Sequence, residues 1–250
     1  MSTIKADKGA QLRLLDLQAV DSALAQLQYK RRNLPEHAEI AGLRTSRNAA
    51  AAELVAADTA VTDLELDQAR AEADLQPVRD RLSRNQRRIS DGTVPDPKAL
   101  ASMVEEVEHL RRRIGDLEDA ELEVMEQLET AIERRERLRD RIEELDAKLE
   151  EVTARRDRAV AEIDSTVAER RTERTQLAPG IPVELLALYD KIGAARGGVG
   201  AAELRQRRCT GCQLELNVAE LRVFASAAED EVLRCEECSR ILVRTASSGL

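Results

Sequence analysis

Two long heptad repeats constrain what this chain can fold into more than any other feature of its sequence. They run over residues 40–89 and 100–166, with apolar side chains recurring at the first (a) and fourth (d) positions. Twelve of fifteen such positions are apolar in the first repeat, and sixteen of twenty in the second. Because this spacing lines up apolar side chains along one seam, the repeats predict two long helices that pair as a coiled coil.

The seven residues D-G-T-V-P-D-P, 91–97, separate the two repeats. Gly92 can take the left-handed conformation that ends a helix, and Asp96 can cap a new helix that has Pro97 in its first turn. This stop and restart predicts an antiparallel hairpin with its turn at 92–97.

An earlier apolar stripe extends the first arm toward the N-terminus. It is out of register with the run that starts at Ile40, and Pro35 stands at the discontinuity, so we expect a break near Pro35. The stripe consists of Leu17, Val20, Leu24, Leu27 and Leu34. The two arms, 10–91 and 98–178, then have nearly equal lengths, which favours a monomer that folds back on itself. A parallel homodimer is the alternative, and it leaves the stop at 92–97 without a role.

The position of the turn determines which residues of the two arms lie opposite each other. Each a position of one arm faces a d position of the other, so that leucines meet along the seam. The predicted leucine pairs are Leu82–Leu110, Leu75–Leu117, Leu64–Leu128, Leu54–Leu138 and Leu43–Leu149. The charged Glu121 and Arg135 would face Ala71 and Ala57, which leaves their stems room to reach water. Pro77 removes a backbone hydrogen bond, so we expect a bend near it.

A boundary follows at L-A-P-G-I-P, residues 177–182, because two prolines and a glycine cannot continue the long helix. The sequence therefore predicts two domains: a coiled-coil hairpin over 1–178, and a linker helix plus zinc ribbon over 179–250. The fold class is mainly α, a long antiparallel coiled-coil hairpin followed by a small C-terminal C4 zinc ribbon with short β-hairpins and a short helix.

Within the second domain, a short helix is expected from Pro182 to about Arg196. Asn217 followed by Glu220 predicts a capping box for another short helix over 218–226. Alternating or β-branched residues predict short strands around 214–216, 232–233 and 241–243.

Four cysteines, the only ones in the chain, form two CxxC pairs: Cys209 with Cys212, and Cys235 with Cys238. Two such pairs separated by about twenty residues can supply the four thiolates of a tetrahedral zinc site. Four protein ligands leave no open position, so we expect one structural Zn²⁺. A redox pair or two disulfides is the alternative, but neither motif lies in a thioredoxin-like strand-to-helix context.

The composition limits which functions and cellular locations fit the chain. Net charge is −9, which argues against electrostatic binding of nucleic acid by the molecule as a whole. The N-terminal residues M-S-T-I-K-A-D-K-G lack the apolar segment of a signal peptide, and no run of eighteen apolar residues exists. Together with reduced, zinc-bound cysteines, these features predict a cytoplasmic protein without a membrane segment.

The chain resembles a bacterial family of C4-type zinc-ribbon proteins with a long N-terminal coiled-coil hairpin. The resemblance rests on L-L-A-L-Y-D-K-I (185–192), G-G-V-G-A-A-E-L (197–204), C-T-G-C (209–212) and C-E-E-C-S-R-I-L (235–242). The family usually has Pro after the third cysteine and Gly after the fourth, where this chain has Glu236 and Ser239. The resemblance implies links to flagellar or type III secretion regulation, through partner proteins and in some cases RNA.

The sequence fits three classes of function to different degrees. The first is a non-enzymatic adaptor that links macromolecules, mainly proteins, through the coiled coil and the zinc-bound ribbon. The alternative is nucleic-acid binding, of RNA more than DNA, in which Arg205, Arg207 and Arg208 beside the first knuckle contact phosphates or a partner. An enzyme is disfavoured because the only histidines, His37 and His109, lie on different arms and pair with no nucleophile.

Overall fold

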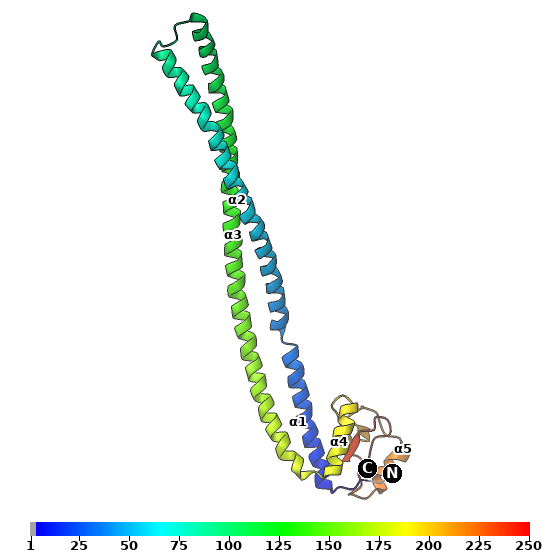
Figure 1. The fold of residues 1–250 in the computed structure, drawn as a ribbon. Coiled ribbons are helices and arrows are strands. Elements are labelled where there is room, and N and C mark those ends of the chain that lie inside the picture. The colour runs from blue at the N-terminus through cyan, green and yellow to red at the C-terminus, as the bar shows by residue number, and fades with distance from the viewer. Residues whose placement is uncertain (1–3) are drawn as a thin grey trace. The chain divides into compact units, whose positions relative to one another are not determined.

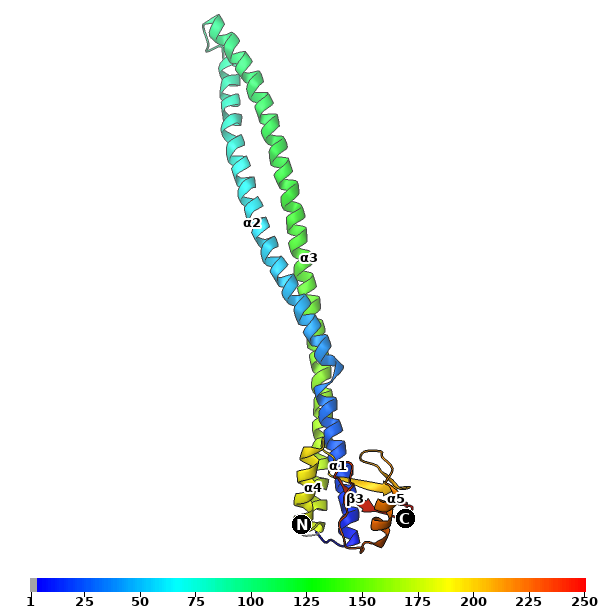
Figure 2. The same cartoon turned by 90° about the vertical axis from the view of Figure 1, so that its right-hand side faces the viewer.

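The computed structural model describes residues 4–250 and confirms the predicted fold class. Three long helices come first: α1 (Lys8–Arg32), α2 (Pro35–Ser90) and α3 (Pro97–Leu177). A smaller region with short strands and helices follows (Figures 1 and 2). No signal peptide is expected at the N-terminus, and the first residues of that segment, 1–3, lie outside the described residues. The chain divides into two compact units, one of residues 38–153 and one of residues 1–37 with 154–250.

The helix ends lie where local chemistry predicts them. Gly92 follows α2 with φ +61°, the left-handed conformation expected for the residue after a helix end. The Asp96 carboxylate accepts hydrogen bonds from the backbone N–H groups of Lys98 (3.3 Å) and Ala99 (3.1 Å), which caps α3. At the predicted break, α1 ends at Arg32 and α2 begins at Pro35, because proline fits the first position of a helix.

In the unit of residues 38–153, α2 and α3 form an antiparallel hairpin. Every a and d position that this unit contains is buried or half-buried, including the polar Arg47, Gln68, Asn85 and Glu121. Several large apolar residues outside those positions, such as Val55 and Leu66, are exposed. The seam inferred from the repeats is therefore the buried surface of the hairpin.

Ion pairs between the arms agree with the predicted register. Arg47, predicted to lie opposite Leu145, pairs with the adjacent Asp146 at 3.1 Å. Nearer the turn, Arg79 contacts Glu118 at 2.6 Å and Arg81 contacts Glu106. These two pairs lie on either side of the level where Val78 is predicted to face Ile114. A shift of one heptad in either direction would displace the facing residues by about 10 Å along the axis and separate one of these two pairs.

Direct contact between Leu64 and Leu128 stays a prediction, and cross-linking can test it. The double variant Leu64→Cys, Leu128→Cys should form an intramolecular disulfide under mild oxidation, because facing seam residues bring their Cβ atoms close together. The matched control is Leu64→Cys, Glu121→Cys, which would face each other only if the arms were shifted by one heptad. Peptide mapping of zinc-loaded protein reports both products, and preferential cross-linking of the control would refute the register.

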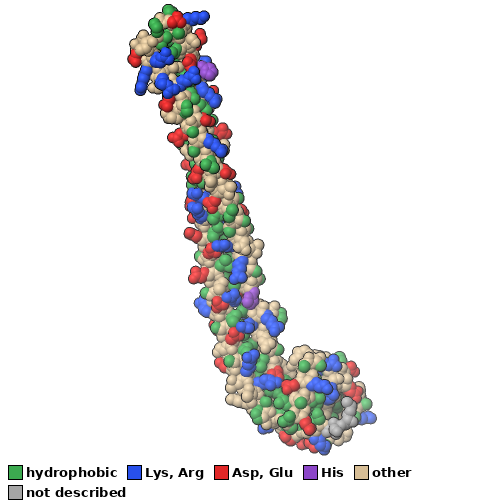
Figure 3. All heavy atoms as spheres, in the orientation of Figure 1, with side chains coloured by type: hydrophobic (Ala, Val, Ile, Leu, Met, Phe, Trp, Pro, Cys, Tyr) green, Lys and Arg blue, Asp and Glu red, His purple; other side chains and the backbone are tan. Residues whose placement is uncertain are grey.

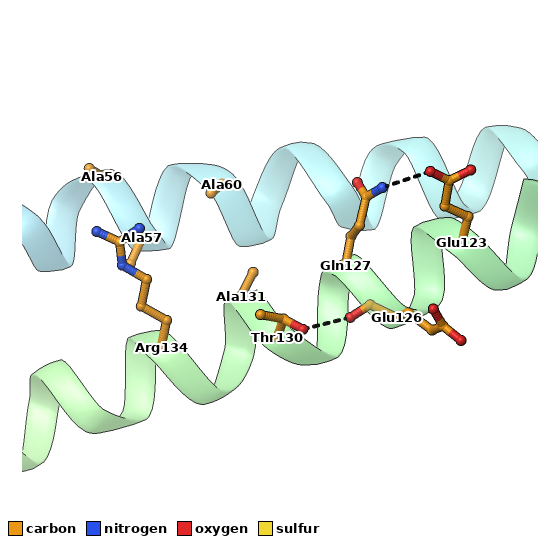
Figure 4. A pocket seen from close by; sticks show the side chains of 9 residues that line it. All are labelled: Ala56, Ala57, Ala60, Glu123, Glu126, Gln127, Thr130, Ala131 and Arg134. Atoms are coloured by element: carbon orange, nitrogen blue, oxygen red, sulfur yellow. Dashed lines mark hydrogen bonds between the residues drawn. The ribbon is translucent and has the colours of Figure 1, made fainter.

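Alanines on the first arm leave a groove along one side of the hairpin. Ala56, Ala57 and Ala60 of α2 line a hollow of about 580 Å³ beside α3 (Figure 4). Residues of α3 that line it are Glu123, Glu126, Gln127, Thr130, Ala131 and Arg134. Arg135, predicted to lie beside Ala57, is half-buried and its guanidinium reaches Glu136 at 3.1 Å.

Helix α2 continues through Pro77, and the bend expected there stays a prediction.

The second unit carries the short elements. Helices α4 (Val183–Ala195) and α5 (Val218–Ser226) occupy the predicted segments, and α5 has the complete Asn217–Glu220 capping box. Strands β1 (Ala201–Arg205), β2 (Arg208–Cys209) and β3 (Ile241–Arg244) form a sheet in the order β2-β1-β3. Strand β1 is antiparallel to β2 and parallel to β3.

The strand predictions were only partly right. Strand β3 confirms the expectation at 241–243, but β1 was not predicted. The segment 214–216 is not a strand and forms a single bridge, between Glu215 and Arg208. Isolated bridges at Glu231 and Arg234 flank the predicted strand at 232–233. Metal-site loops and their turns override the local alternation in these short segments.

The start of α1 belongs to the core of the second unit. Ala10, Leu14 and Leu17 are fully buried in one cluster with residues of α4, β1 and β3. The other buried members are Ala6, Ile181, Leu185, Tyr189, Ile192, Ala201, Ile241 and Val243. The compact units thus differ from the predicted division after residue 178, because the N-terminal helix packs with the C-terminal region.

Candidate metal centre

Two loops of the same form carry the four cysteines. In the first, which follows β2, the Cys209 N–H donates to the Leu214 carbonyl (2.9 Å) and the Gln213 N–H donates to the Cys209 carbonyl (2.8 Å). In the second, the Cys235 N–H donates to Arg240 (3.0 Å) and the Ser239 N–H donates to Cys235 (2.8 Å). These tight turns direct both thiols of each CxxC motif to the same side, as in zinc ribbons.

The four sulfur atoms of Cys209, Cys212, Cys235 and Cys238 all lie within 4.8 Å of one another. Across the two loops, Cys209 Sγ is 3.8 Å from Cys238 Sγ, and Cys212 Sγ is 3.9 Å from Cys235 Sγ. A tetrahedron with Zn–S bonds of about 2.3 Å has S···S edges of about 3.8 Å. A disulfide would need about 2.05 Å. The four cysteines are therefore arranged for metal binding and fit one structural zinc ion.

Burial of the thiols opposes their ionisation, a cost that a bound cation would offset. Burial raises the pKa of Cys209 far above its ordinary value and that of Cys235 to about 11. Burial also acts to raise the pKa of Cys238, but hydrogen bonds from Arg240 and neighbouring cysteines bring it down to about 7. Clustered thiolates repel one another in such a site, so a dication that keeps them deprotonated would remove this cost.

Each loop ends on a residue with a left-handed backbone. Gln213 has φ +63° and Ser239 has φ +64°, at equivalent positions after the second cysteine of each motif. Glycine adopts this conformation without the steric cost that other residues incur, about 1 kcal/mol or more. The strain at Ser239 explains why glycine suits the position after the fourth cysteine.

We expect Ser239→Gly to stabilise the ribbon by up to about 1 kcal/mol, because it relieves the left-handed strain. The Ser239 side chain makes no hydrogen bond within residues 4–250, so little is lost by removing it. Ser226→Gly, at the end of α5, is the matched control and should not stabilise. Hydrogen exchange of the β3 amides under mild denaturant measures the effect of each substitution on the stability of the ribbon. Equal or lower protection in Ser239→Gly than in the wild type would contradict the strain argument.

Arg240 is a structural residue of the site that the sequence did not single out. Its guanidinium donates to the carbonyls of Val199 (3.0 Å), Gly211 (3.2 Å) and Arg196 (3.0 Å). The first two acceptors lie in the α4–β1 loop and the first cysteine loop. A Cβ atom at Gly211 would lie 2.7 Å from the Arg240 side chain, so this glycine makes the close approach possible. Arg240 therefore holds the two loops together rather than contributing a free positive charge.

The three predicted contact arginines lie on one β-hairpin. Arg205 and Arg208 face each other at the ends of β1 and β2, and Gln206 and Arg207 form the two-residue turn with φ +47° and +62°. All three arginines are exposed, and each also has a partner in the chain. Arg205 contacts Glu203 (2.7 Å), Arg208 contacts Glu215 (3.6 Å), and Arg207 Nε donates to the Gly249 carbonyl (3.0 Å).

The two histidines are placed separately. His37 Nε2 lies 3.2 Å from the Arg31 carbonyl in one unit, and His109 lies beside Arg112, Arg113 and Asp116 in the other.

Across residues 4–250, no helix combines the length and apolar composition needed to cross a membrane.

Comparison with known proteins matches both parts of the chain. Residues 17–197 match the model of the CT398-like coiled coil hairpin domain, and residues 208–242 match the C4-type zinc ribbon domain. A Mycobacterium tuberculosis protein, Rv2229c, is 34% identical over 241 residues, which cover 96% of this chain and 98% of that protein.

Solved structures share the fold. A structure from Mycobacterium smegmatis is 35% identical, with a TM-score of 0.83 over 96% of this chain and 100% of that one. CT398 from Chlamydia trachomatis is 16% identical, with a TM-score of 0.68 over 95% of this chain and 98% of that one. The fold, with its structural metal site, supports a non-catalytic structural or scaffold role. The chain belongs to the family of proteins that have a CT398-like coiled-coil hairpin domain followed by a C4-type zinc ribbon.

Proposed function

We propose that this protein is a non-enzymatic cytoplasmic adaptor that links protein partners through its hairpin and its zinc ribbon, with Cys209, Cys212, Cys235 and Cys238 as the zinc ligands. The observation that carries this proposal is the hairpin seam, which one chain buries by itself. The seam of a monomer needs no second chain, so the outer faces of α2 and α3 remain available to other proteins. The flagellar or secretion role implied by the resemblance stays a prediction.

Affinity capture of the full-length protein, with and without nuclease, tests the adaptor. We expect specific proteins to be recovered after nuclease treatment and to bind again when purified and mixed with this chain. A Cys209→Ser variant shows which partners need the folded ribbon. Recovery that disappears with nuclease, or partners that fail to bind when purified, would contradict the adaptor.

A second function is binding of RNA or DNA by the ribbon. It is favoured by the exposed end of the β1–β2 hairpin, which carries Arg205, Arg207 and Arg208. If these arginines contact phosphates, changing all three to Ala should lower nucleic-acid affinity about tenfold or more and reduce its salt dependence. The matched control changes three exposed arginines of the coiled coil, Arg44, Arg134 and Arg141, to Ala. Fluorescence anisotropy with single-stranded RNA reports both. Equal binding by wild type and ribbon variant would exclude this surface.

A further inference from the structure

The end of the hairpin that carries the 91–96 turn is basic, although the chain as a whole has a net charge of −9. Residues 79–113 contain nine Lys or Arg and six Asp or Glu. Figure 3 shows several Lys and Arg side chains exposed together at this end of the hairpin. The excess of positive charge is therefore concentrated where α2 ends and α3 begins.

Six of these cations lie near one end of the hairpin and have no side-chain partner among the described residues; single arginines farther along, such as Arg44 and Arg134, share this property. Elsewhere, Arg47 pairs with Asp146 and Arg139 with Asp58. Within residues 4–250, no side-chain ion pair or hydrogen bond engages six exposed cations of this end, which we call the basic end: Arg84, Arg87, Arg88, Lys98, Arg112 and Arg113. Asp116 lines the same surface hollow as Arg112 and Arg113 without an ion pair to either.

The basic end is long enough to meet several phosphates at once. Lys98 and Arg113 are fifteen positions apart on α3, which corresponds to about 22 Å along the helix. A nucleic-acid duplex carries about one charge per 1.7 Å of axis, so a dozen phosphate charges fall within this length. Arg84 and Arg88 lie one turn apart on α2 and add exposed positive charge at this end of the hairpin.

The chemistry of this surface fits a phosphate backbone better than an acidic protein. Protein interfaces depend on buried aromatic or large apolar anchors, and Val104, 46% exposed, is the one exposed large apolar residue at 79–113. Residues 38–153 contain no Phe, Tyr or Trp, so His109 is the single aromatic ring in this unit that could stack on an unpaired base. Five of the six cations are arginines, whose guanidinium groups bind phosphate oxygens in pairs.

We propose that the basic end of the hairpin binds the phosphate backbone of a nucleic-acid duplex without reading its base sequence. The basic end belongs to the unit of residues 38–153, whereas Arg205, Arg207 and Arg208 of the zinc ribbon belong to the other unit. Binding is electrostatic, so it weakens steeply with salt and is indifferent to sequence.

The test is fluorescence anisotropy of the full-length, zinc-loaded protein with a 20-base-pair DNA duplex and an RNA duplex, at several salt concentrations. We expect wild-type binding at about 50 mM salt and at least a tenfold loss when Arg84, Arg87 and Arg88 are changed to Ala. The salt slope should fall by about two to three, one unit for each lost phosphate contact. Changing the same three residues to Lys should keep most of the binding, because the charge remains.

Two matched triple variants decide where binding occurs. The Ala variant of Arg44, Arg134 and Arg141 should bind like the wild type, since it removes equal charge elsewhere on the hairpin. Loss confined to the Arg205, Arg207 and Arg208 variant would move the site to the ribbon and overturn the proposal. The absence of duplex binding at 50 mM salt would also overturn it. Polyglutamate serves as the acidic-protein probe, and if the basic end bound polyglutamate but not the duplex, the proposal would likewise be wrong. The adaptor is judged separately, by nuclease-resistant protein partners.

Discussion

Replacing Cys209 with Ser is expected to abolish stoichiometric zinc binding and unfold the ribbon while the long helices persist. Metal binding contributes on the order of 10–16 kcal/mol in small zinc domains, and three thiolates cannot complete the tetrahedral site. The Cys209 side chain is fully buried in a cluster with Leu204, Leu216, Phe224 and Leu242, so the metal site and this small core depend on each other.

Elemental analysis should find one zinc per wild-type chain and far less in the variant. Hydrogen exchange should show lost protection in β1, β3 and α5, with α2 and α3 unchanged. The matched control is Glu236→Ser, an exposed residue of the second CxxC loop whose replacement should leave zinc content intact. If the Cys209 variant retained one zinc and full protection, the assignment of this ligand would be wrong.

Replacing Leu14 with Ala should destabilise the C-terminal unit by about 2–5 kcal/mol, although Leu14 is nearly two hundred residues away from the cysteines in sequence. Its side chain is 0% exposed and packs in the cluster that includes Leu185, Tyr189 and Ile241. The N-terminal segment also pairs with the ribbon, since the Ala6 N–H donates to the Asp230 carbonyl at 2.8 Å.

Leu12→Ala is the control for this prediction, because Leu12 lies on the same helix but is 38% exposed. It should cost less than about 1 kcal/mol. Denaturant-dependent hydrogen exchange of α4 and β3 measures both effects, since circular dichroism would mainly report the long helices. Equal protection in the Leu14 and Leu12 variants would show that α1 does not stabilise the ribbon.

Polar contacts reinforce the placement of α1. The Gln18 carboxamide oxygen accepts from the Gly200 N–H at 2.8 Å, and its nitrogen donates to the Gly198 carbonyl at 3.0 Å. Asp21 accepts from the Tyr189 hydroxyl at 2.7 Å and from Arg174 at 2.7 Å. Burial, followed by this hydrogen bond to Asp21, raises the pKa of Tyr189 well above its ordinary range, so the hydroxyl remains a donor.

Features with a local or periodic signature could be predicted from the sequence. The heptad seam, the turn with Gly92 and Asp96, the capping box at Asn217, and the cysteine spacing each depend on residues within a few positions of one another or on a regular repeat. Their geometry follows from backbone sterics, helix periodicity and ligand chemistry, which act whatever the rest of the chain does.

Only the tertiary structure decided which distant segments share a core. Nothing in the stripe of α1 distinguishes an apolar face that meets α3 from one that meets β3, because burial is non-directional. The parallel pairing of β1 with β3 and the three carbonyls held by Arg240 likewise join residues far apart in sequence. Such contacts leave no periodic pattern along the chain, so the sequence determined the hairpin and the metal ligands, while folding determined the core that supports them.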